Sequence, residues 1–206
     1  VHIHSLYLFH TFAAARIARR AGVPYIIRPH GTLDPFLWKR HRARKQVMET
    51  LFQNRAFRGA AALHYTAEEE MRLAEPYACG ARGVVVPNGL SMADYADIPP
   101  EGEFRRHHPE LAGKRIVLFL SRLNFKKGLD VLVPAFAQAA ASRPDLHMVI
   151  AGPDDGEKAG TEALLTATGM TSRTSFVGML NHREKLACLR DASVFALPSY
   201  SENFGI

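Results

Sequence analysis

The sequence predicts an α/β fold in which parallel, doubly wound sheets form two domains. Short apolar strands alternate with helical segments along the chain, which is the pattern typical of such sheets. The strands expected at residues 116–120 and 194–197 are continuously apolar, as strands covered on both faces are. A stretch rich in proline and charge, residues 93–113, separates the two runs of elements. We therefore expect two domains, residues 1–92 and 114–206, joined by a linker at 93–113.

The first half shows the less regular pattern of the two. Residues 1–4 are expected to be the interior of a strand. Residues 8–21 are rich in alanine and arginine with helical periodicity, and a Gly-Val-Pro sequence from Gly22 ends this helix. Thr66 is expected to cap a helix over residues 67–75, whose first turn is acidic. Further strands are expected at residues 25–28, 60–65 and 84–86.

A long basic helix is expected over residues 36–58. Gly59 would end it, and the apolar residues Val47, Leu51 and Phe52 fit one face.

The second half has the cleaner alternation. Strands are expected at residues 116–120, 147–151, 175–177 and 194–197, and helices at 128–142, 157–168 and 182–191, the first of them containing Pro134. Ligands of open parallel sheets bind outside the carboxyl ends of the strands. The loops expected at that edge are residues 121–128, 152–156, 178–181 and 198–205.

The composition is that of an ordinary globular protein, with 47% apolar and 22% charged residues among 206. Cys79 and Cys188 lie far apart in apolar patterns, so we expect two buried thiols rather than a disulfide framework or a zinc site. No apolar run approaches the ~20 residues that a membrane-spanning helix needs. No signal-peptide pattern or glycosylation sequon points to secretion.

The net charge of +6 favours anionic partners such as nucleotide phosphates, an acidic membrane surface or nucleic acid. Much of the excess is concentrated in residues 39–45. This segment has two interpretations that the sequence leaves open. It is either a patch that contacts an acidic membrane or the solvated face of an amphipathic helix.

Arg122 and Lys127 are the first candidate site residues. If the preceding strand ends near residue 121, both cations lie at the sheet edge, where they suit a diphosphate. Gly128 permits close backbone approach, and the helix after it points its positive end at the same place. In group transfer these cations would stabilise the charge on the leaving group. The alternative is that both are merely solvated loop residues.

Glu202 is the second candidate, in a loop that follows the last apolar strand. Its carboxylate is suited to accept hydrogen bonds from sugar hydroxyls, and the amides of Asn203, Phe204 and Gly205 would surround an anion if a helix begins there. The alternative is an acidic residue near a helix N-terminus. Together with the two cations, this loop predicts a site for an anionic, hydroxyl-rich ligand such as a sugar nucleotide.

His30, at the end of a first-half strand, is the third candidate, because an imidazole there can bind a sugar or transfer a proton. The alternative is a structural or solvated histidine. Asp154 and Asp155 would suit a metal ion, but Gly156 follows them, so we interpret the pair as a turn.

Three absences exclude other enzyme classes. The sequence has no Gly-x-Gly-x-x-Gly after a strand, no Walker A loop and no Gly-x-Ser-x-Gly elbow. Nicotinamide-dependent, P-loop and α/β-hydrolase sites are therefore disfavoured.

Six segments in order make the chain resemble the family 4, or group 1, glycosyltransferases of the GT-B fold. They are Arg28-Pro29-His30-Gly31-Thr32-Leu33-Asp34-Pro35, Val86-Pro87-Asn88-Gly89, Leu120-Ser121-Arg122-Leu123 with Lys126-Lys127-Gly128, Ile150-Ala151-Gly152, Phe176-Val177-Gly178, and Leu197-Pro198-Ser199 with Glu202-Asn203-Phe204-Gly205. The resemblance extends over nearly the whole chain.

The resemblance implies two Rossmann-like domains and a nucleotide-diphosphate sugar, UDP- or GDP-linked, bound mainly by the second. Arg122 and Lys127 match the positions that hold the diphosphate, and no metal ion or other cofactor is expected. Glu202 matches the first glutamate of the Glu-x7-Glu motif and would contact the transferred sugar. His30 matches the histidine that approaches this sugar from the first domain. The donor-binding set that the resemblance implies is Arg122, Lys127, Gly128, Gly152, Val177, Gly178, Glu202, Asn203, Phe204 and Gly205.

The resemblance also implies a retaining transferase acting on a glycan or lipid-linked acceptor, in synthesis of a bacterial cell-surface polysaccharide or glycolipid. A cytoplasmic location, with or without peripheral contact at the inner membrane face, would follow. The second glutamate of the motif would fall beyond Ile206. We therefore expect a chain truncated at both ends, with an incomplete first domain, which on its own would bind donor weakly.

Two rivals remain open at this point. One is another GT-B activity, such as sucrose- or trehalose-related synthesis, which acceptor-side loops would distinguish. The other is a non-catalytic basic module that binds nucleic acid or an acidic membrane. Nucleic acid is not expected as a partner, because the basic residues lack interleaved aromatics and a known binding motif.

Overall fold

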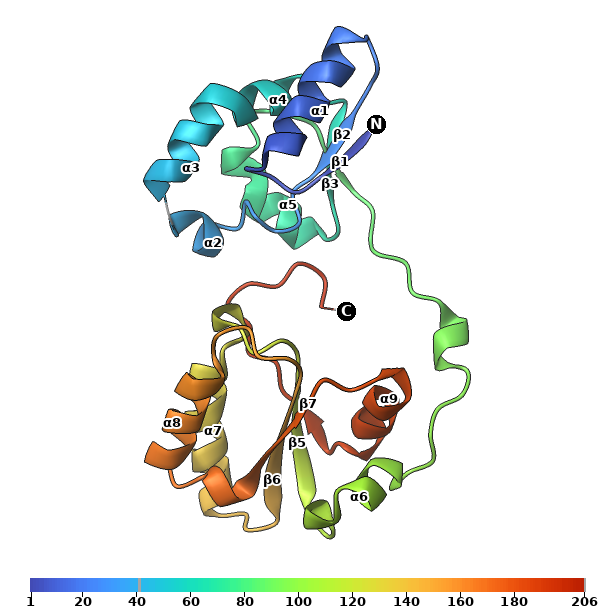
Figure 1. Ribbon diagram of the computed structural model, residues 1–206, viewed down its shortest axis with the longest axis vertical. Coiled ribbons are helices and arrows are strands. Elements are labelled where there is room, and N and C mark those ends of the chain that lie inside the picture. The colour runs from blue at the N-terminus through green and yellow to red at the C-terminus, as the bar shows by residue number, and fades with distance from the viewer. Residues whose placement is uncertain (41, 206) are drawn as a thin grey trace. The chain divides into compact units, whose positions relative to one another are not determined.

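The structure is a computed structural model that describes residues 1–40 and 42–205 (Figure 1). The chain forms two compact units, the first from residues 1–90 together with 201–205 and the second from residues 91–200. Each unit contains one parallel four-stranded sheet with its helices, which confirms the predicted α/β class.

In the first unit the strands lie in the order β1 (His2–His4), β2 (Ile26–Arg28), β3 (Ala62–Tyr65) and β4 (Gly83–Val85), all parallel. Helices α1 (Phe9–Arg20), α4 (Asn54–Arg58) and α5 (Glu68–Ala74) contribute to a core with Ile27 and Leu63. Side chains alternate across β1, so that Ile3 is buried in this core while His2 and His4 are exposed.

The long basic helix predicted over residues 36–58 is wrong as a single element. The structure has α2 (Pro35–Lys39), α3 (Arg42–Met48), a π-helical turn η1 (Glu49–Gln53) and then α4. Asp34 caps α2 by accepting the Phe36 N–H at 2.7 Å, and Arg40 has an extended ψ of 123° where that helix ends.

The predicted apolar face of that helix is wrong too. The side chains of Val47 and Leu51 are 57% and 60% exposed, whereas Gln53, Ala56 and Phe57 are buried. A π-helical turn holds more residues per turn than an α-helix, so it rotates the faces of the helix that follows it. A pattern of constant period therefore assigns the wrong residues to the core.

The predicted Thr66 cap is also wrong. Ala67 occupies the cap position of α5 without a side-chain bond, and the Thr66 hydroxyl donates instead to Glu70 at 2.8 Å. The Thr66 N–H donates to the same Glu70 carboxylate at 2.7 Å. The buried Glu70 side chain, in the acidic first turn of α5, thus holds Thr66 in place.

The second unit matches its predicted elements closely. Its strands lie in the order β7 (Thr174–Gly178), β6 (Leu146–Ala151), β5 (Arg115–Leu120) and β8 (Val194–Phe195), all parallel. Its helices are α6 (Glu103–His107), α7 (Leu129–Ala141), α8 (Lys158–Ala167) and α9 (His182–Asp191). Pro134 lies inside α7, and Asn181 and Glu184 form a capping box at the start of α9. One core cluster includes side chains of α7 and α8, and the other those of α6 and α9, as in a doubly wound sheet.

The remaining short elements are 3-10 turns. They are η2 (Glu75–Tyr77), η3 (Met92–Tyr95), η4 (Pro109–Leu111), η5 (Phe125–Lys127) and η6 (Thr171–Arg173).

Both cysteines are free. Cys188 is fully buried, which confirms the expected buried thiol, and burial raises its pKa to about 12. Cys79 is only half-buried, so the expectation of a buried thiol is wrong there, although partial burial still raises its pKa. Its backbone φ of +53° places it in a turn after η2, where it packs against the core of the first unit but stays partly exposed.

Residues 93–113, expected as a linker, contain α6 and contribute Phe104 and Leu111 to the buried core of the second unit. The buried carboxylate of Asp191 accepts the N–H groups of Gly102 at 2.6 Å and Arg105 at 3.1 Å. The Arg105 guanidinium in turn donates to the carbonyls of Leu111, Lys114 and Asp191. These bonds attach the segment to the end of α9.

Replacing Asp191 with Ala should therefore destabilise the second unit. The change leaves two buried N–H groups without their acceptor, at a cost of about 2–4 kcal/mol. Chemical denaturation of the Asp191→Ala variant should show this loss, and the exposed Glu162→Ala variant should lose much less. Equal stability of the Asp191→Ala variant and the parent chain would contradict the assigned role of this carboxylate.

Candidate functional site

Two glycines allow the loops at the carboxyl edge of the second sheet to approach one another. A Cβ on Gly152 would lie 1.9 Å from the Ser121 carbonyl oxygen, and the Gly152 φ of +136° is unfavourable for other residues. A Cβ on Gly128 would lie 2.0 Å from the Pro198 carbonyl oxygen, at a φ of +69°. The ends of β5, β6 and β8 can converge because neither position carries a side chain.

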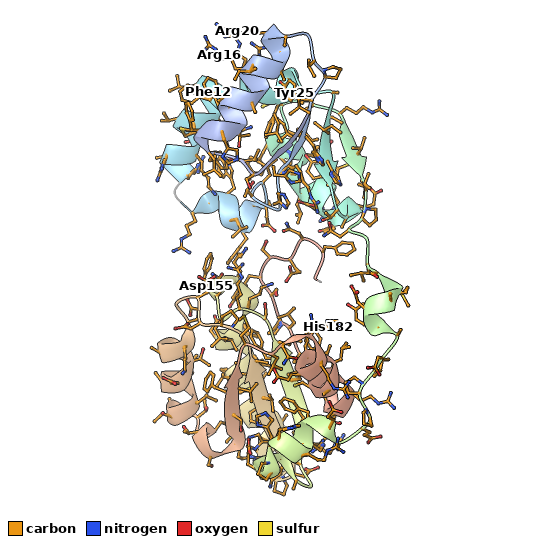
Figure 2. All side chains as sticks on the ribbon, turned by 45° about the vertical axis from the view of Figure 1, so that its right-hand side comes forward. Phe12, Arg16, Arg20, Tyr25, Asp155 and His182 are labelled. Atoms are coloured by element: carbon orange, nitrogen blue, oxygen red, sulfur yellow. The ribbon has the colours of Figure 1, made fainter. Side chains whose placement is uncertain are left out.

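Arg122 lies in the loop after β5 and forms an ion pair at 2.6 Å with Asp155 of the loop after β6. Asp155 is labelled in Figure 2. The Asn124 amide donates to the same carboxylate oxygen at 2.9 Å. The two loops are also joined through the Leu123 N–H, which donates to the Pro153 carbonyl at 2.9 Å. The Arg122 side chain is 57% exposed, so its guanidinium is held at the edge and is accessible to solvent.

Lys127 and Gly128 lie where η5 ends and α7 begins. The Asn124 side chain caps η5 by accepting the Lys126 N–H, and the backbone carbonyl of Asn124 accepts the Lys127 N–H at 2.8 Å. Gly128 is the N-cap of α7, so the positive end of a 13-residue helix lies beside the half-buried Lys127. The structure thus brings Arg122, Lys127 and Gly128 together in one loop, between β5 and α7.

Val177 and Gly178 lie at the end of β7, next to Gly152. The Gly152 N–H donates to the Gly178 carbonyl at 2.7 Å, and Gly178 has a φ of +72°. Val177 and Met179 line a hollow of about 520 Å³ between this strand end and the helices α6 and α9. His182, labelled in Figure 2, begins α9 and bonds the Asp94 carbonyl at 2.7 Å.

Asp154 confirms the interpretation of the Asp-Asp pair as a turn. Its carboxylate accepts the N–H groups of Gly156, Glu157 and Lys158, and these bonds, that of Lys158 first, hold its pKa below the ordinary value. Among residues 1–40 and 42–205, no group of three or more His, Cys, Asp and Glu side chains is arranged to hold a metal ion.

His30 lies in the turn that follows β2 in the first unit and has a φ of +54°, a conformation that few residues other than glycine adopt. The next N–H, that of Gly31, donates to the buried Glu70 carboxylate at 2.8 Å. Glu70 therefore joins the His30 loop to Thr66 and orients it. Glu70 could not be recognised from the sequence, because three consecutive glutamates at a helix start indicate only an acidic first turn.

The imidazole of His30 contacts a second histidine. His4 Nδ1 and His30 Nε2 lie 2.9 Å apart and share a hydrogen bond whose donor depends on the tautomers. His2, His4 and His64 continue this row of rings, with His2 Nε2 and His64 Nδ1 3.3 Å apart. Partial desolvation, then Arg28 and then His4, lower the pKa of His30, so its neutral form is favoured.

Glu202 and its neighbours belong to the first unit by their contacts. The Ser201 hydroxyl donates to Asp34 at 2.7 Å, and the Asn203 carbonyl accepts the Thr66 hydroxyl at 3.3 Å. The Asn203 side chain lies against Gly31, where a Cβ would be 1.8 Å from its amide oxygen. Glu202 itself is exposed and, with Asn203, lines a small cavity beside Glu70.

No helix begins within residues 202–205, which was the condition for an anion site at the amides of this loop. Residues 201–205 form bends, and Gly205 has a φ of +69°, which is left-handed. The side-chain and carbonyl bonds of Ser201 and Asn203 hold the segment in this irregular form.

Comparison with known proteins identifies the family. The family model described as "Glycosyl transferases group 1" matches residues 101–206. The chain belongs to the group 1 glycosyltransferases. A second family model, "Glycosyl transferase 4-like domain", matches residues 1–89.

Curated relatives of this group 1 chain carry transferase names. The chain is 30% identical over 131 residues to a phosphatidyl-myo-inositol mannosyltransferase of Mycolicibacterium smegmatis. The matched region covers 63% of this chain and 31% of the relative. It is 35% identical over 128 residues to a D-inositol 3-phosphate glycosyltransferase of an Arthrobacter strain, and this match covers 55% of this chain and 30% of the relative. The match thus spans about a third of the length of these relatives.

Solved structures show the same GT-B fold. Anabaena HepE in complex with UDP-glucose superposes with a TM-score of 0.77 at 20% identity, covering 98% of this chain and 54% of that one. A sucrose-phosphate synthase of Thermosynechococcus elongatus gives a TM-score of 0.74 at 20% identity, and the match covers 100% of this chain and 51% of the synthase. At this identity the likeness establishes the fold.

We expect the His4 ring to influence the titration of His30 in this group 1 chain. Since the folded-state pKa of His30 is lowered, protonation favours the unfolded chain. The first unit should therefore lose stability as the pH falls from about 6.5 through that lowered pKa. A His4→Phe substitution removes one neighbouring charge and the shared bond, so the His30 pKa should rise.

Imidazole NMR signals followed across this pH range measure the effect, with His147 of the second unit as the control. Burial lowers the pKa of His147, which has no contact with His4. An unchanged His30 titration in the His4→Phe variant would refute the coupling.

Proposed function

We propose that the protein transfers a sugar, with retention, from a nucleotide-diphosphate donor to a glycan or lipid-linked acceptor. The observation that carries this proposal is the loop between β5 and α7. It presents Arg122 and Lys127 at the carboxyl edge of a parallel sheet, directly before the positive end of α7. Family membership supports the same activity.

In this proposal residues 114–206 form the donor domain and residues 1–92 the acceptor-side domain. The second unit supplies the diphosphate part of the donor site, while residues 201–205 of the donor domain belong to the first unit by their contacts. Arg122 offers a planar fork of donors to one phosphate, and Lys127 offers a mobile cation to the other. As the bond between sugar and diphosphate breaks, negative charge accumulates on the leaving phosphate. These cations and the α7 amides stabilise that charge more than they stabilise the bound donor.

The remaining predicted residues complete the donor site. Val177 and Gly178 contact the base, and the backbone at Gly152 and Gly128 approaches the donor closely. Glu202 accepts hydrogen bonds from the hydroxyls of the transferred sugar, near the amides of Asn203, Phe204 and Gly205. His30, whose lowered pKa favours the neutral imidazole, donates a hydrogen bond to that sugar or accepts one from it.

UDP-sugars are the favoured donors, since the HepE structure contains UDP-glucose. A lipid-linked or inositol-bearing acceptor is supported by the names of the two curated relatives. Within the described residues no helix has the length and apolar character to cross a membrane. A lipid-linked acceptor would be reached by peripheral contact at the inner membrane face.

Nucleotide binding tests the proposal. UDP, more than GDP or ADP, should raise the melting temperature of the chain, and calorimetry should give a dissociation constant. Replacing both Arg122 and Lys127 with Ala removes two charge-assisted contacts, so affinity should fall by at least about tenfold. The Arg143→Ala, Lys158→Ala variant removes the same charge from exposed positions of the second unit and should retain affinity. A folded chain that responds to none of the three nucleotides would refute the donor site.

A further inference from the structure

The loop that follows β1 in the first unit has a strained backbone. Ser5 and Tyr7 both have left-handed conformations, with φ of +71° and +59°, which residues other than glycine seldom adopt. Strain of this kind persists only where surrounding contacts hold it, and it is concentrated at functional sites. The loop lies at the carboxyl edge of the first sheet, where parallel sheets bind their ligands.

Two side chains of η1 hold this loop. The Tyr7 hydroxyl donates to Glu49 Oε1 at 2.6 Å, and the Tyr7 N–H donates to Gln53 Oε1 at 3.4 Å. The π-helical form of η1 is itself frequent at functional sites. Gln53 is buried, and within residues 1–40 and 42–205 its Nε2 has no hydrogen-bond partner. This amide therefore has a donor available beside the Tyr7 backbone.

Tyr7 lines a hollow of about 190 Å³ together with three side chains of α3, namely Arg44, Lys45 and Met48. We call it the Tyr7 hollow. Tyr7 and Met48 supply apolar walls, and the other two side chains supply cations. Sites for drug-sized ligands measure about 300–1,000 Å³, so this smaller hollow suits one sugar-sized ring.

The two cations of the Tyr7 hollow lack carboxylate partners. Lys45 Nζ donates to the uncharged Leu37 carbonyl at 2.6 Å and lies 5.6 Å from the centre of the Tyr7 ring. Within the described ranges, 1–40 and 42–205, neither Lys45 nor Arg44 forms an ion pair. Partial burial lowers the pKa of Lys45, which shows that its charge is poorly solvated. An anion that enters the hollow would compensate this charge.

Glu49 positions Tyr7 but does not pair with these cations. It is the only acidic residue among residues 35–58. Its Oε1 accepts hydrogen bonds from the Tyr7 hydroxyl and, at 2.7 Å, from Trp38 Nε1. The charge of Glu49 opposes the lowering of the Lys45 pKa without reversing it. The hollow therefore keeps its positive character.

These features favour one class of ligand. The planar fork of Arg44 and the ammonium of Lys45 suit a phosphate or a carboxylate. The apolar walls and the small volume suit a single ring rather than a nucleotide. A neutral sugar would leave both cations without a partner, and a free anion would leave the apolar walls in water.

We propose that the Tyr7 hollow binds the acceptor of the transfer reaction, and that the acceptor is a sugar or cyclitol ring with an anionic substituent, a phosphate or a carboxylate. Arg44 and Lys45 bind the anionic group, while Tyr7 and Met48 pack against the ring. This inference rests on the proposed function, because it narrows the acceptor named there. It involves no residue of the diphosphate site.

The fluorescence of Trp38 tests the proposal, because Trp38 is the single tryptophan and shares Glu49 with Tyr7. The probes are glucose 6-phosphate, inositol 1-phosphate and glucuronate, with glucose and inositol as neutral counterparts. At least one anionic probe should change the fluorescence and bind about tenfold more tightly than its neutral counterpart, since it adds charge-assisted hydrogen bonds. No binding of any anionic probe, or equal binding of the neutral ones, would overturn the proposal.

Single substitutions locate the binding. Arg44→Gln should weaken binding of the anionic probe about tenfold, and because Arg44 is exposed the variant should stay folded. Lys45→Gln should weaken it similarly, with circular dichroism and melting temperature as the test of folding. Arg20→Gln removes the same charge from an exposed position of α1 and should retain the affinity. Unchanged binding in the Arg44→Gln variant, or an equal loss in the Arg20→Gln variant, would count against the hollow.

Two further measurements separate this site from other anion sites. Inorganic phosphate that binds as tightly as the sugar phosphate would show that the ring contributes nothing, and would overturn the proposal. UDP binding should be unchanged in the Arg44→Gln variant, and the Arg122→Ala, Lys127→Ala variant should still bind the anionic probe. A chain that binds UDP but no anionic probe would refute this inference alone. A chain that binds the probe but no nucleotide would refute the donor site alone.

Discussion

The carbonyl oxygen of Ser121 occupies the space that a side chain at residue 152 would need, and the edge of the second sheet depends on that contact. Because Gly152 has no Cβ, the ends of β5 and β6 approach closely. The Leu123 N–H then reaches the Pro153 carbonyl, and Arg122 reaches Asp155. A bulkier residue at 152 would separate the two loops and move Arg122 away from the start of α7.

In the first unit a buried carboxylate holds the candidate loop in place. Glu70 is buried and accepts hydrogen bonds from the Gly31 N–H, the Thr66 N–H and the Thr66 hydroxyl. A buried carboxylate is stable only when such donors replace its water. The network therefore holds His30 in a left-handed conformation that its sequence alone would not favour. In both units a loop with the candidate residues is held by atoms outside that loop.

The sequence was sufficient where one local pattern controls the structure. The apolar strands of the second half, and Arg122, Lys127 and Gly128 in the loop after β5, could be located because hydrophobic burial and turn chemistry act over a few residues. It was insufficient where a distant contact decides. The π-helical turn at Glu49–Gln53 rotated the buried face from Leu51 to Phe57, and Glu70 acquired its role only through residues on another loop. The bonds of Ser201 to Asp34 and of Asn203 to Thr66, which hold the Glu202 loop in an irregular form, could not be read from the sequence either.

The ion pair between Arg122 and Asp155 determines which anions the edge of the second sheet can bind. Arg122 already has Asp155 as a partner, so an incoming anion must compete with a carboxylate at 2.6 Å. A diphosphate that also engages Lys127 and the amides of α7 can compete, whereas a single weak anion gains little. A partnered arginine therefore suits selective recognition of one ligand.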